Sequence, residues 1–600
     1  MRVRHLLSTG SSRATVTGER AFFLRNKAGD FLTLFPSPQT RYAGWFVQDG
    51  ARFIKVLEHA AVIAPDGSEA VVDMITTTDD SVIWEYSDGL TLTWKMSSNG
   101  NGVLLCCSKP AKLRLTLDMR PMYVFPDMGR NYHSEKDGGS CLVSYEDAEL
   151  GKNAFLHLRS KGGLDLIGNW VEHAYPRDLA RDSAPTSLFV YELGTVTAQQ
   201  ISFGFGWDKQ TALKNSLATS RIKCNPPRRI GINHTHATLL TQNAVARTMV
   251  RQSLDWLQTE NGMYAGLPWF HQVWSRDELI AALGLSRAEQ IAIIRRYINL
   301  PLIEGELPTY TGSGTTCADG LGWLCLLIEE VGLDSLDDET HAKIETMLVE
   351  SHQQLKQYRQ AAHGLIFSGY NATWMDTIGR EGYRIEIQAM YALLLSQLFR
   401  LTSQEKYQQE RISFIGKIRQ LLFAGGYFHD GLGDPSKRPN VFLAYLIQPD
   451  LLTLQNWVSC FDKVLRALST PWGGLASLDS HDPRFQAVTT GENNRSYHNG
   501  DSWFFVNNLA AIALHRLDAR RYGTEVISLL QSSTNEVLFE HMVGRPGEIS
   551  SASHLDSFGC GIQAFSGGAY LALLNDLEGY SAGHERDSTA FFWEDTDTSS

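Results

Sequence analysis

The sequence predicts a two-part fold, in which an N-terminal antiparallel β-sandwich precedes an all-α (α/α)6 barrel. Residues 13–222 consist of short alternating apolar and polar runs separated by turn residues, a pattern typical of antiparallel strands. After about residue 236 the pattern changes to long amphipathic helices. Six times a polar or aromatic loop leads into a mostly apolar helix. This repetition predicts six inner helices surrounded by six outer ones.

The β-sandwich is expected at residues 13–222, after an N-terminal extension of residues 1–12. Asp88-Gly89 and Asn99-Gly100 are typical hairpin turns between strand-like runs. A connector with two adjacent prolines, Pro226-Pro227, can continue neither a helix nor a central strand, so we place a linker at residues 223–235. The clearest strand-like runs are Ala21–Leu24, Phe31–Leu34, Gly44–Val47, Ser81–Tyr86 and Leu90–Lys95.

The barrel is expected at residues 236–580, followed by an acidic tail at residues 581–600. Apolar periodicity predicts long helices at Lys343–Tyr358, Ile387–Arg400 and Phe504–Leu517. In such a barrel the loops before the inner helices open at one end, so their residues should converge on one pocket. The residues that mark these six loops are Asp277, Asp319, Glu386, Asn440, His498 and Gln563.

Composition narrows the class of ligand. The net charge of −12 argues against nucleic acid as a partner, because phosphate binding needs clustered Lys and Arg. The eight cysteines form no C-x-x-C pair, and Met1–Leu7 leads into polar residues without an apolar core. We therefore expect reduced thiols and a cytoplasmic protein. No apolar run is long enough to span a membrane. No metal, nucleotide or dinucleotide motif occurs, so we expect no metal and no cofactor.

Asp376 is the first candidate catalytic residue. It follows Trp374 and Met375 on a loop that leads into a long apolar helix. A carboxyl group beside an aromatic face and away from bulk water has a raised pKa, which keeps the acid form available near neutral pH. The alternative is that Asp376 only caps the following segment, because Asp is favoured at turns and helix starts.

Glu548 is the second candidate carboxylate, on the loop before the last inner helix. An exposed acidic residue in a loop is the alternative interpretation. Hydrolysis of a glycosidic bond requires two carboxyl groups, an acid for the leaving oxygen and a base or nucleophile on the other face of the sugar. Asp376 and Glu548 would fill those two roles.

The other loops offer side chains suited to sugar binding. Tryptophan rings can stack on the C–H face of a pyranose, and an Arg-Asp pair supplies both donors and acceptors to its hydroxyl groups. A capped helix with a structural ion pair is the alternative for the first loop. The candidate binding residues are Trp269, Trp274, Arg276, Asp277, Asp319, Trp374, Arg380, Glu386, His498 and Gln563.

Several of these motifs, in this order, resemble those of glycogen debranching enzymes, specifically their amylo-α-1,6-glucosidase domain. The resemblance covers about residues 20–575. Gly547, Ser275 and Phe565 stand where that family usually has Pro, Gly and Trp. The segments that carry the resemblance are Leu267–Phe270, Trp274–Asp277, Thr373–Asp376, Arg380–Glu386, Tyr497–Gly500 and Gln563–Ser566.

The resemblance implies an inverting hydrolysis that releases glucose from α-glucans, with Asp376 as general acid and Glu548 as the nearest match to the base. About 230 residues of β-like pattern precede the barrel, which leaves no room for the (β/α)8 transferase domain of the large eukaryotic enzymes. The alternatives are a glucoamylase- or trehalase-like enzyme, a phosphorylase, and a carbohydrate-binding protein without activity.

Overall fold

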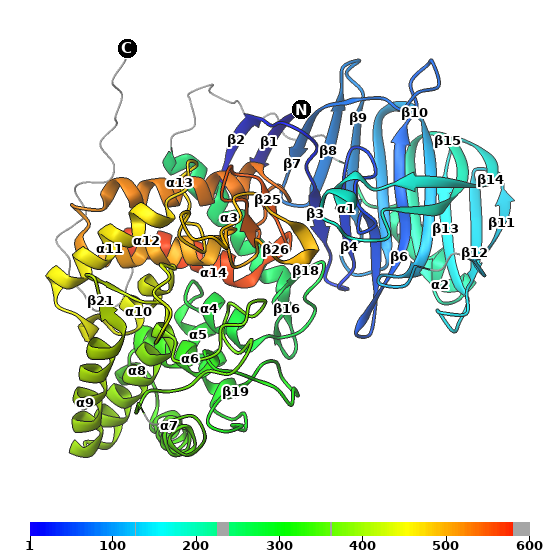
Figure 1. Ribbon diagram of the computed structural model, residues 1–600. Coiled ribbons are helices and arrows are strands. Elements are labelled where there is room, and N and C mark those ends of the chain that lie inside the picture. Colours follow the sequence, from blue (N-terminus) through cyan, green and yellow to red (C-terminus); the bar gives the residue numbers. More distant parts are fainter. Residues whose placement is uncertain (126–127, 225–238, 361–362, 580–600) are drawn as a thin grey trace, which may run out of the picture. The chain divides into compact units, whose positions relative to one another are not determined.

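The computed structural model describes residues 1–125, 128–224, 239–360 and 363–579 (Figure 1). These residues divide into two compact units. The β-unit comprises Met1–Met249, Gly491–Asn493 and Val537–Arg545, and the helical unit comprises Val250–Thr490, Asn494–Glu536 and Pro546–Ser600. Most of the predicted linker (223–235) and the predicted tail (581–600) lie outside the described residues.

The β-unit contains one 15-stranded sheet. Its longest strands, β10 and β15, have 20 residues each. The same unit contains two short helices, α1 (Pro176–Ala180) and α2 (Lys209–Thr219). The strands are β1 (Arg2–Leu7), β2 (Gly10–Thr15), β3 (Phe22–Arg25), β4 (Phe31–Leu34), β5 (Gly44–Asp49), β6 (Arg52–Val62), β7 (Val72–Thr77), β8 (Ser81–Tyr86), β9 (Thr91–Met96), β10 (Gly102–Pro121), β11 (Asn131–Asp137), β12 (Ser140–Glu146), β13 (Ala154–Ser160), β14 (Gly163–Ala174) and β15 (Ser187–Gly206).

The sheet branches at its two long strands. The first part of β10 pairs with β9, the second part pairs with β6, and β15 pairs with β10 along both parts. One arm continues through β9 to β2 and the other through β6 to β3. The arms contact each other where β3 meets β8 and β9. Buried aromatic rings such as Trp84 and Trp94 fill the interior, as the alternating sequence pattern predicts.

The N-terminal residues are part of this sheet, so the predicted extension of residues 1–12 is wrong. Strand β1 buries every second residue, namely Val3, His5 and Leu7. His5 is polar but fully buried, where it bonds to Thr77 and to the backbone oxygen of Leu538. Strand β1 pairs with β7 in the parallel direction, whereas the sequence analysis expected antiparallel strands only.

A disulfide joins Cys106 on β10 to Cys224, across 118 residues of sequence. The expectation that all thiols are reduced is therefore wrong for this pair. The other six cysteines are buried and form no disulfide within the described part of the chain.

Along the chain of the helical unit, helices of an inner ring alternate with helices that pack outside it. Several pairs of short strands lie in the connecting loops, near the helix starts. The helices are α3 (Leu239–Leu257), which begins in the β-unit, α4 (Ser275–Ala282), α5 (Arg287–Tyr297), α6 (Gly320–Val331), α7 (Asp338–Tyr358), α8 (Ile385–Thr402), α9 (Glu405–Leu422), α10 (Asn440–Ile447), α11 (Leu454–Leu468), α12 (Phe504–Asp518), α13 (Gly523–Phe539) and α14 (Ala564–Leu577). The short strands are β16 (Gln258–Thr259), β17 (Gly262–Met263), β18 (Gly266–Leu267), β19 (Leu307–Pro308), β20 (Thr316–Cys317), β21 (Phe423–Ala424), β22 (Tyr427–Phe428), β23 (Ser502–Trp503), β24 (Ile549–Ser550), β25 (Ser557–Phe558) and β26 (Ile562–Gln563).

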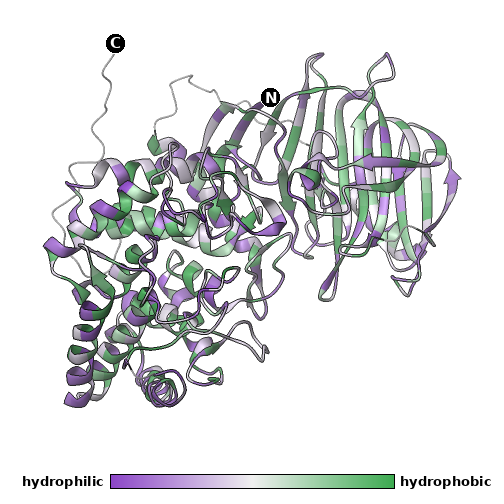
Figure 2. Cartoon of the chain, viewed as in Figure 1, coloured by the Kyte–Doolittle hydropathy of each residue, from purple (hydrophilic) through white to green (hydrophobic). Residues whose placement is uncertain are grey.

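Six helices form a closed ring, because α4, α6, α8, α10, α12 and α14 each pack against the next and α14 packs against α4. Helices α5, α7, α9 and α11 pack on this ring from outside. Outer helices have one hydrophilic side, which Figure 2 shows along α9. Inner helices such as α10 are buried on nearly all sides, as expected for helices enclosed by others.

Five of the six marker residues predicted from the sequence lie in the first turn of a ring helix or immediately before it, and the sixth, His498, lies six residues before α12. Asp277 is in the first turn of α4, Asp319 immediately precedes α6, and Gln563 immediately precedes α14. The loops before the six ring helices therefore all open at one end of the ring. In the part of the chain that the structure describes, no helix is both long enough and apolar enough to cross a membrane.

Candidate active site

The loops before the ring helices enclose a cavity. Its wall combines aromatic rings with three carboxyl groups, those of Asp277, Asp376 and Glu548. The full lining is Ala265, Phe270, Trp274, Arg276, Asp277, Trp374, Asp376, Tyr497, Trp503, Phe505, Glu548, Gln563 and Phe565. Seven of the twelve predicted site residues are in this set, namely Trp274, Arg276, Asp277, Trp374, Asp376, Glu548 and Gln563.

Asp376 is held at the cavity by the two residues before it. Trp374 is buried and donates its Nε1–H to Asn440 Oδ1 at 2.8 Å. Met375 is fully buried beside Arg438 and Asn440. With both neighbours anchored inside, the Asp376 side chain emerges into the cavity with 37% of its surface exposed. Helix α8 begins nine residues later, at Ile385, so Asp376 is not its cap.

The two oxygens of Asp376 have different neighbours. Oδ1 lies 3.5 Å from His498 Nε2, and Oδ2 lies 3.7 Å from an Arg276 terminal nitrogen. Burial alone would raise the pKa of Asp376, but His498 and Arg276 outweigh it, and the pKa lies below its ordinary value. A raised pKa was predicted from the sequence. That prediction is wrong, because the two neighbours that lower the pKa come from distant loops.

Glu548 is positioned by short strands. Strand β24, which begins at the next residue, pairs with both β23 and β25. The carboxylate is 3% exposed and accepts hydrogen bonds from Tyr497 Oη at 2.5 Å and from the Cys560 backbone N–H at 2.8 Å. These bonds leave the side chain in one orientation at the cavity wall. The alternative of an exposed loop residue is wrong.

Asp277 has a carboxyl group with a strongly raised pKa. Burial is the main cause and raises its pKa to about 7, with help from the negative charges of Glu548 and Asp376, although Arg276 opposes the shift. Its Oδ1 accepts a hydrogen bond of 2.9 Å from Gln563 Nε2. Strand β18 pairs with β26, which brings the first and last loops together and so places these two side chains side by side.

Asp277→Asn is expected to stabilise the protein more at pH 8.5 than at pH 5.5. In the unfolded chain the Asp277 pKa is near 3.8, and in the folded protein it is about 7. The stability contributed by the protonated carboxyl is complete below the unfolded value and is lost as the pH rises through about 7. Asn cannot ionise and keeps the bond to Gln563. Thermal melting at both pH values measures the difference.

Asp376→Asn serves as the control in the same melting experiment. The Asp376 pKa is lowered, so the ionised group contributes stability above its unfolded pKa and loses it as the pH falls. This variant should gain nothing at pH 8.5. Equal melting shifts for Asp277→Asn at the two pH values would contradict the raised pKa.

Three other predicted residues, Asp319, Arg380 and Glu386, support the wall from behind. Asp319 is fully buried and receives the Arg276 Nε–H at 2.7 Å. Arg380 lies between the carboxylates of Glu386 and Asp430, and it also donates to Thr373 Oγ1 at 3.0 Å. These residues are not in the cavity lining formed by the described part of the chain. They fix the positions of Arg276 and of the Thr373–Asp376 turn.

His498 and Trp269 were predicted to contact a bound sugar directly, and here too the structure differs from the prediction. His498 is fully buried, stacked on Trp503 and edge-on to Trp374. Trp269 is half-buried, and its neighbour Phe270 lines the cavity instead. Among the described residues, neither His498 nor Trp269 belongs to the cavity wall.

Two kinds of residue at the site were not predicted from the sequence. The first is Asp430, which is fully buried and joins Arg380, Arg384 and Asn440, but which lies in a loop with no motif of its own. The second is the aromatic wall. Phe270, Tyr497 and Phe565 lie inside recognised motifs, and Trp503 and Phe505 follow one, so their position relative to the motifs was a usable signal.

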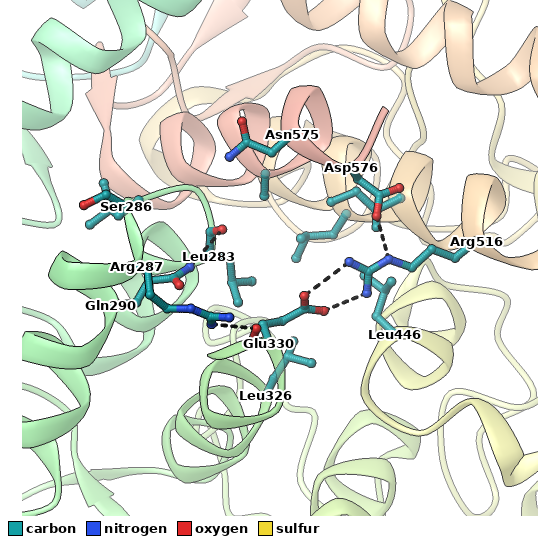
Figure 3. A pocket seen from close by; sticks show the side chains of 14 residues that line it. Leu283, Ser286, Arg287, Gln290, Leu326, Glu330, Leu446, Arg516, Asn575 and Asp576 are labelled. Atoms are coloured by element: carbon teal, nitrogen blue, oxygen red, sulfur yellow. Dashed lines mark hydrogen bonds and ion pairs between the residues drawn. The ribbon is translucent and has the colours of Figure 1, made fainter. Parts of the chain in front are cut away.

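A second cavity, of about 340 Å³, lies toward the C-terminal ends of the ring helices (Figure 3). Its two carboxylates, Glu330 and Asp576, are both paired with Arg516 at 2.7 Å. Leu326, Leu446 and other aliphatic side chains form the rest of the wall, and no aromatic residue is in the described lining. Since its carboxylates are committed to an arginine, this cavity is not the candidate for acid-base chemistry.

Comparison with known proteins identifies the family. Residues 242–572, more than half of the chain, match the family model described as amylo-alpha-1,6-glucosidase. A bacterial glucoamylase crystallised with acarbose has the same fold, with a TM-score of 0.60 at 13% identity over 94% of this chain and 96% of that chain. A mannosylglycerate hydrolase from Thermus thermophilus, crystallised with Tris, has a TM-score of 0.42 at 13% identity over 55% and 99%. No curated protein sequence matches the chain.

The family match covers the ring helices except for the last five residues of α14, and it includes every residue of the described lining of the first cavity. The glucoamylase likeness extends over both units and therefore supports the same order of a β-sheet region followed by a helical domain. The chain belongs to the amylo-α-1,6-glucosidase family and is a glycoside hydrolase.

Proposed function

We propose that this glycoside hydrolase releases glucose from α-glucans, with the α-1,6 branch stubs of glycogen or limit dextrin as its main substrate. The observation that carries the proposal is that Asp376 and Glu548, which come from distant loops, line one aromatic cavity in a chain of this family. Two carboxyl groups beside one sugar site are what glycosidic hydrolysis requires.

In the proposed mechanism, Asp376 is the general acid and protonates the glycosidic oxygen. Glu548 is the general base and removes a proton from a water molecule, whose oxygen attacks the anomeric carbon from the opposite face. The bond to the leaving group breaks, and glucose leaves with inverted configuration. The two bonds from Tyr497 and Cys560 stabilise the ionised form of Glu548.

The acid form of Asp376 becomes accessible when a sugar fills the cavity. About a third of the Asp376 side chain is exposed to solvent. A bound sugar covers this surface, and the added desolvation raises the pKa of Asp376 from its lowered value. Substrate binding and activation of the acid are thereby coupled.

The non-reducing glucose is proposed to lie against Trp274 and Trp374, with its hydroxyl groups bonded to Arg276, Asp277 and Gln563. These side chains share the wall with the two carboxyl groups. Aromatic rings cover the apolar faces of a pyranose, and the charged groups give directional bonds to its hydroxyls. Asp319, Arg380 and Glu386 would act by holding those residues in place.

We infer that the six-helix ring with its outer helices is an (α/α)6 barrel and that the branched sheet is a β-sandwich packed in two layers. The ring contacts of α4 to α14 and the contact between the two sheet arms support this description. A boundary near Met249 replaces the predicted one at residue 236, because the first part of α3 groups with the sheet.

The test follows the hydrolysis of panose by proton NMR in the anomeric region. Panose carries one α-1,6 and one α-1,4 bond. Early β-glucose together with maltose is expected, because inversion at the α-1,6 bond gives both products. Early α-glucose would refute inversion. Isomaltose as the first disaccharide would refute the preference for the α-1,6 bond.

A further inference from the structure

His498 touches the candidate acid but not the cavity. Its side chain is fully buried, between Trp503 at 4.8 Å and Trp374 at 5.4 Å between ring centroids. The two tryptophans line the cavity, and His498 lies behind them. A bound sugar would meet the tryptophan rings and would not reach the imidazole. Substrate binding is therefore a poor explanation for this histidine.

The imidazole has one polar neighbour on the cavity side. Nε2 lies 3.5 Å from Asp376 Oδ1, and among the described residues neither ring nitrogen makes a closer hydrogen bond. A buried polar ring without partners is costly, so its contact with Asp376 needs an explanation. Catalytic hydrogen bonds are often long in an empty site and tighten in the complex.

We propose that His498 is a positioning residue for the general acid: its Nε2–H donates to Asp376 Oδ1 and so keeps the acid proton on Oδ2. A carboxylic acid carries one proton, and the oxygen that accepts a bond from a donor is the one that does not hold it. Oδ2 faces Arg276, which lines the cavity, but the nearest Arg276 nitrogen is 3.7 Å away, beyond hydrogen-bond distance, so this oxygen can hold the proton. The proton is thus held where a glycosidic oxygen can receive it.

Surrounding groups are compatible with a neutral imidazole that donates from Nε2. Burial lowers the pKa of His498, and the positive charges of Arg438 and Arg380 lower it further, while Asp376 opposes them. A neutral ring with its hydrogen on Nε2 leaves only an acceptor unpaired at Nδ1. The titratable and charged groups around the pair are Arg276, Asp277, Arg380, Arg438, Tyr497 and Glu548.

The inference rests on the proposed function of Asp376 as acid, and the experiment separates the two. His498→Phe keeps a flat ring between the tryptophans but has no donor, whereas His498→Gln restores a donor. Each variant is assayed on panose, which needs a protonated leaving group, and on α-glucosyl fluoride, which does not. We expect His498→Phe to lower kcat for panose by about 10- to 100-fold, with KM changed less than about twofold. Hydrolysis of the fluoride should change little.

The pH profile gives a second readout. Loss of the donor raises the pKa of Asp376, so the alkaline limb of kcat/KM for panose should move to higher pH in His498→Phe. His498→Gln should recover most of the rate and return the limb toward its original position. A merely structural histidine would not move this limb.

Three outcomes would overturn the inference: equal losses on panose and the fluoride, a raised KM with unchanged kcat, or His498→Gln as slow as His498→Phe. Asp376→Asn is measured alongside. If that variant hydrolyses panose as fast as the wild type, it is the proposed function of Asp376 that fails, whatever His498 does.

Discussion

Asp376→Asn is expected to lower kcat for panose by about 10²- to 10⁴-fold, the usual contribution of general acid catalysis. Asn has nearly the same shape but cannot give a proton to the glycosidic oxygen. The anchors of the turn, Trp374 and Met375, are unchanged, so the cavity should keep its form. Initial rates of glucose release measure the effect, and KM should change little because Asp376 acts mainly in the transition state.

The same variant should retain much of its activity on α-glucosyl fluoride, since fluoride leaves without protonation. This contrast separates the loss of an acid from general damage to the site. A variant that loses both activities equally would contradict the assignment of Asp376 as acid. So would a variant that keeps its rate on panose.

Much of the fold could be predicted from the sequence because the local patterns agree with the overall architecture. Predicted runs such as Phe31–Leu34 and Ser81–Tyr86 coincide with β4 and β8. The predicted helix Phe504–Leu517 is α12 to within one residue. The strands β1 and β2 were missed because buried His5 interrupts the apolar alternation of β1 with a polar residue, whose partners are 72 and 533 residues away. The disulfide partners are also far apart, so spacing gave no signal.

The cavity could be predicted in part for the same reason. A motif such as Trp274–Asp277 places its residues at a helix start, and the ring brings six such starts together. What a motif does not reveal is the second layer around it. Asp430 contacts Arg380 from a loop without a motif, the contact of His498 with Asp376 could not be read from its own motif, and the sign of the Asp376 pKa shift depends on side chains from two other loops. Such contacts depend on three-dimensional packing and leave no periodic pattern.

Glu548→Gln is expected to lower kcat by about 10²- to 10⁴-fold on both panose and α-glucosyl fluoride. The base must activate water whatever the leaving group is, so the fluoride does not bypass it, in contrast to Asp376→Asn. Glu536→Gln is the matched control. Glu536 is also buried and accepts hydrogen bonds from the Gly547 backbone and Ser557, but the described cavity lining does not include it. This control should keep most of its activity.

An azide rescue experiment tests the role of Glu548 further. Azide needs no base, so it should restore turnover of the fluoride by Glu548→Gln, and attack from the face opposite the fluoride gives β-glucosyl azide. Proton NMR identifies the product. A product of α configuration would instead indicate that a carboxylate first forms a covalent bond to the sugar, and the inverting mechanism would fail. Rescue of Glu548→Gln but not of Glu536→Gln, with the β product, would show that the carboxylate held by Tyr497 and Cys560 acts on the face opposite the leaving group. Early β-glucose from panose with the wild type then identifies that carboxylate as the base and not as a nucleophile.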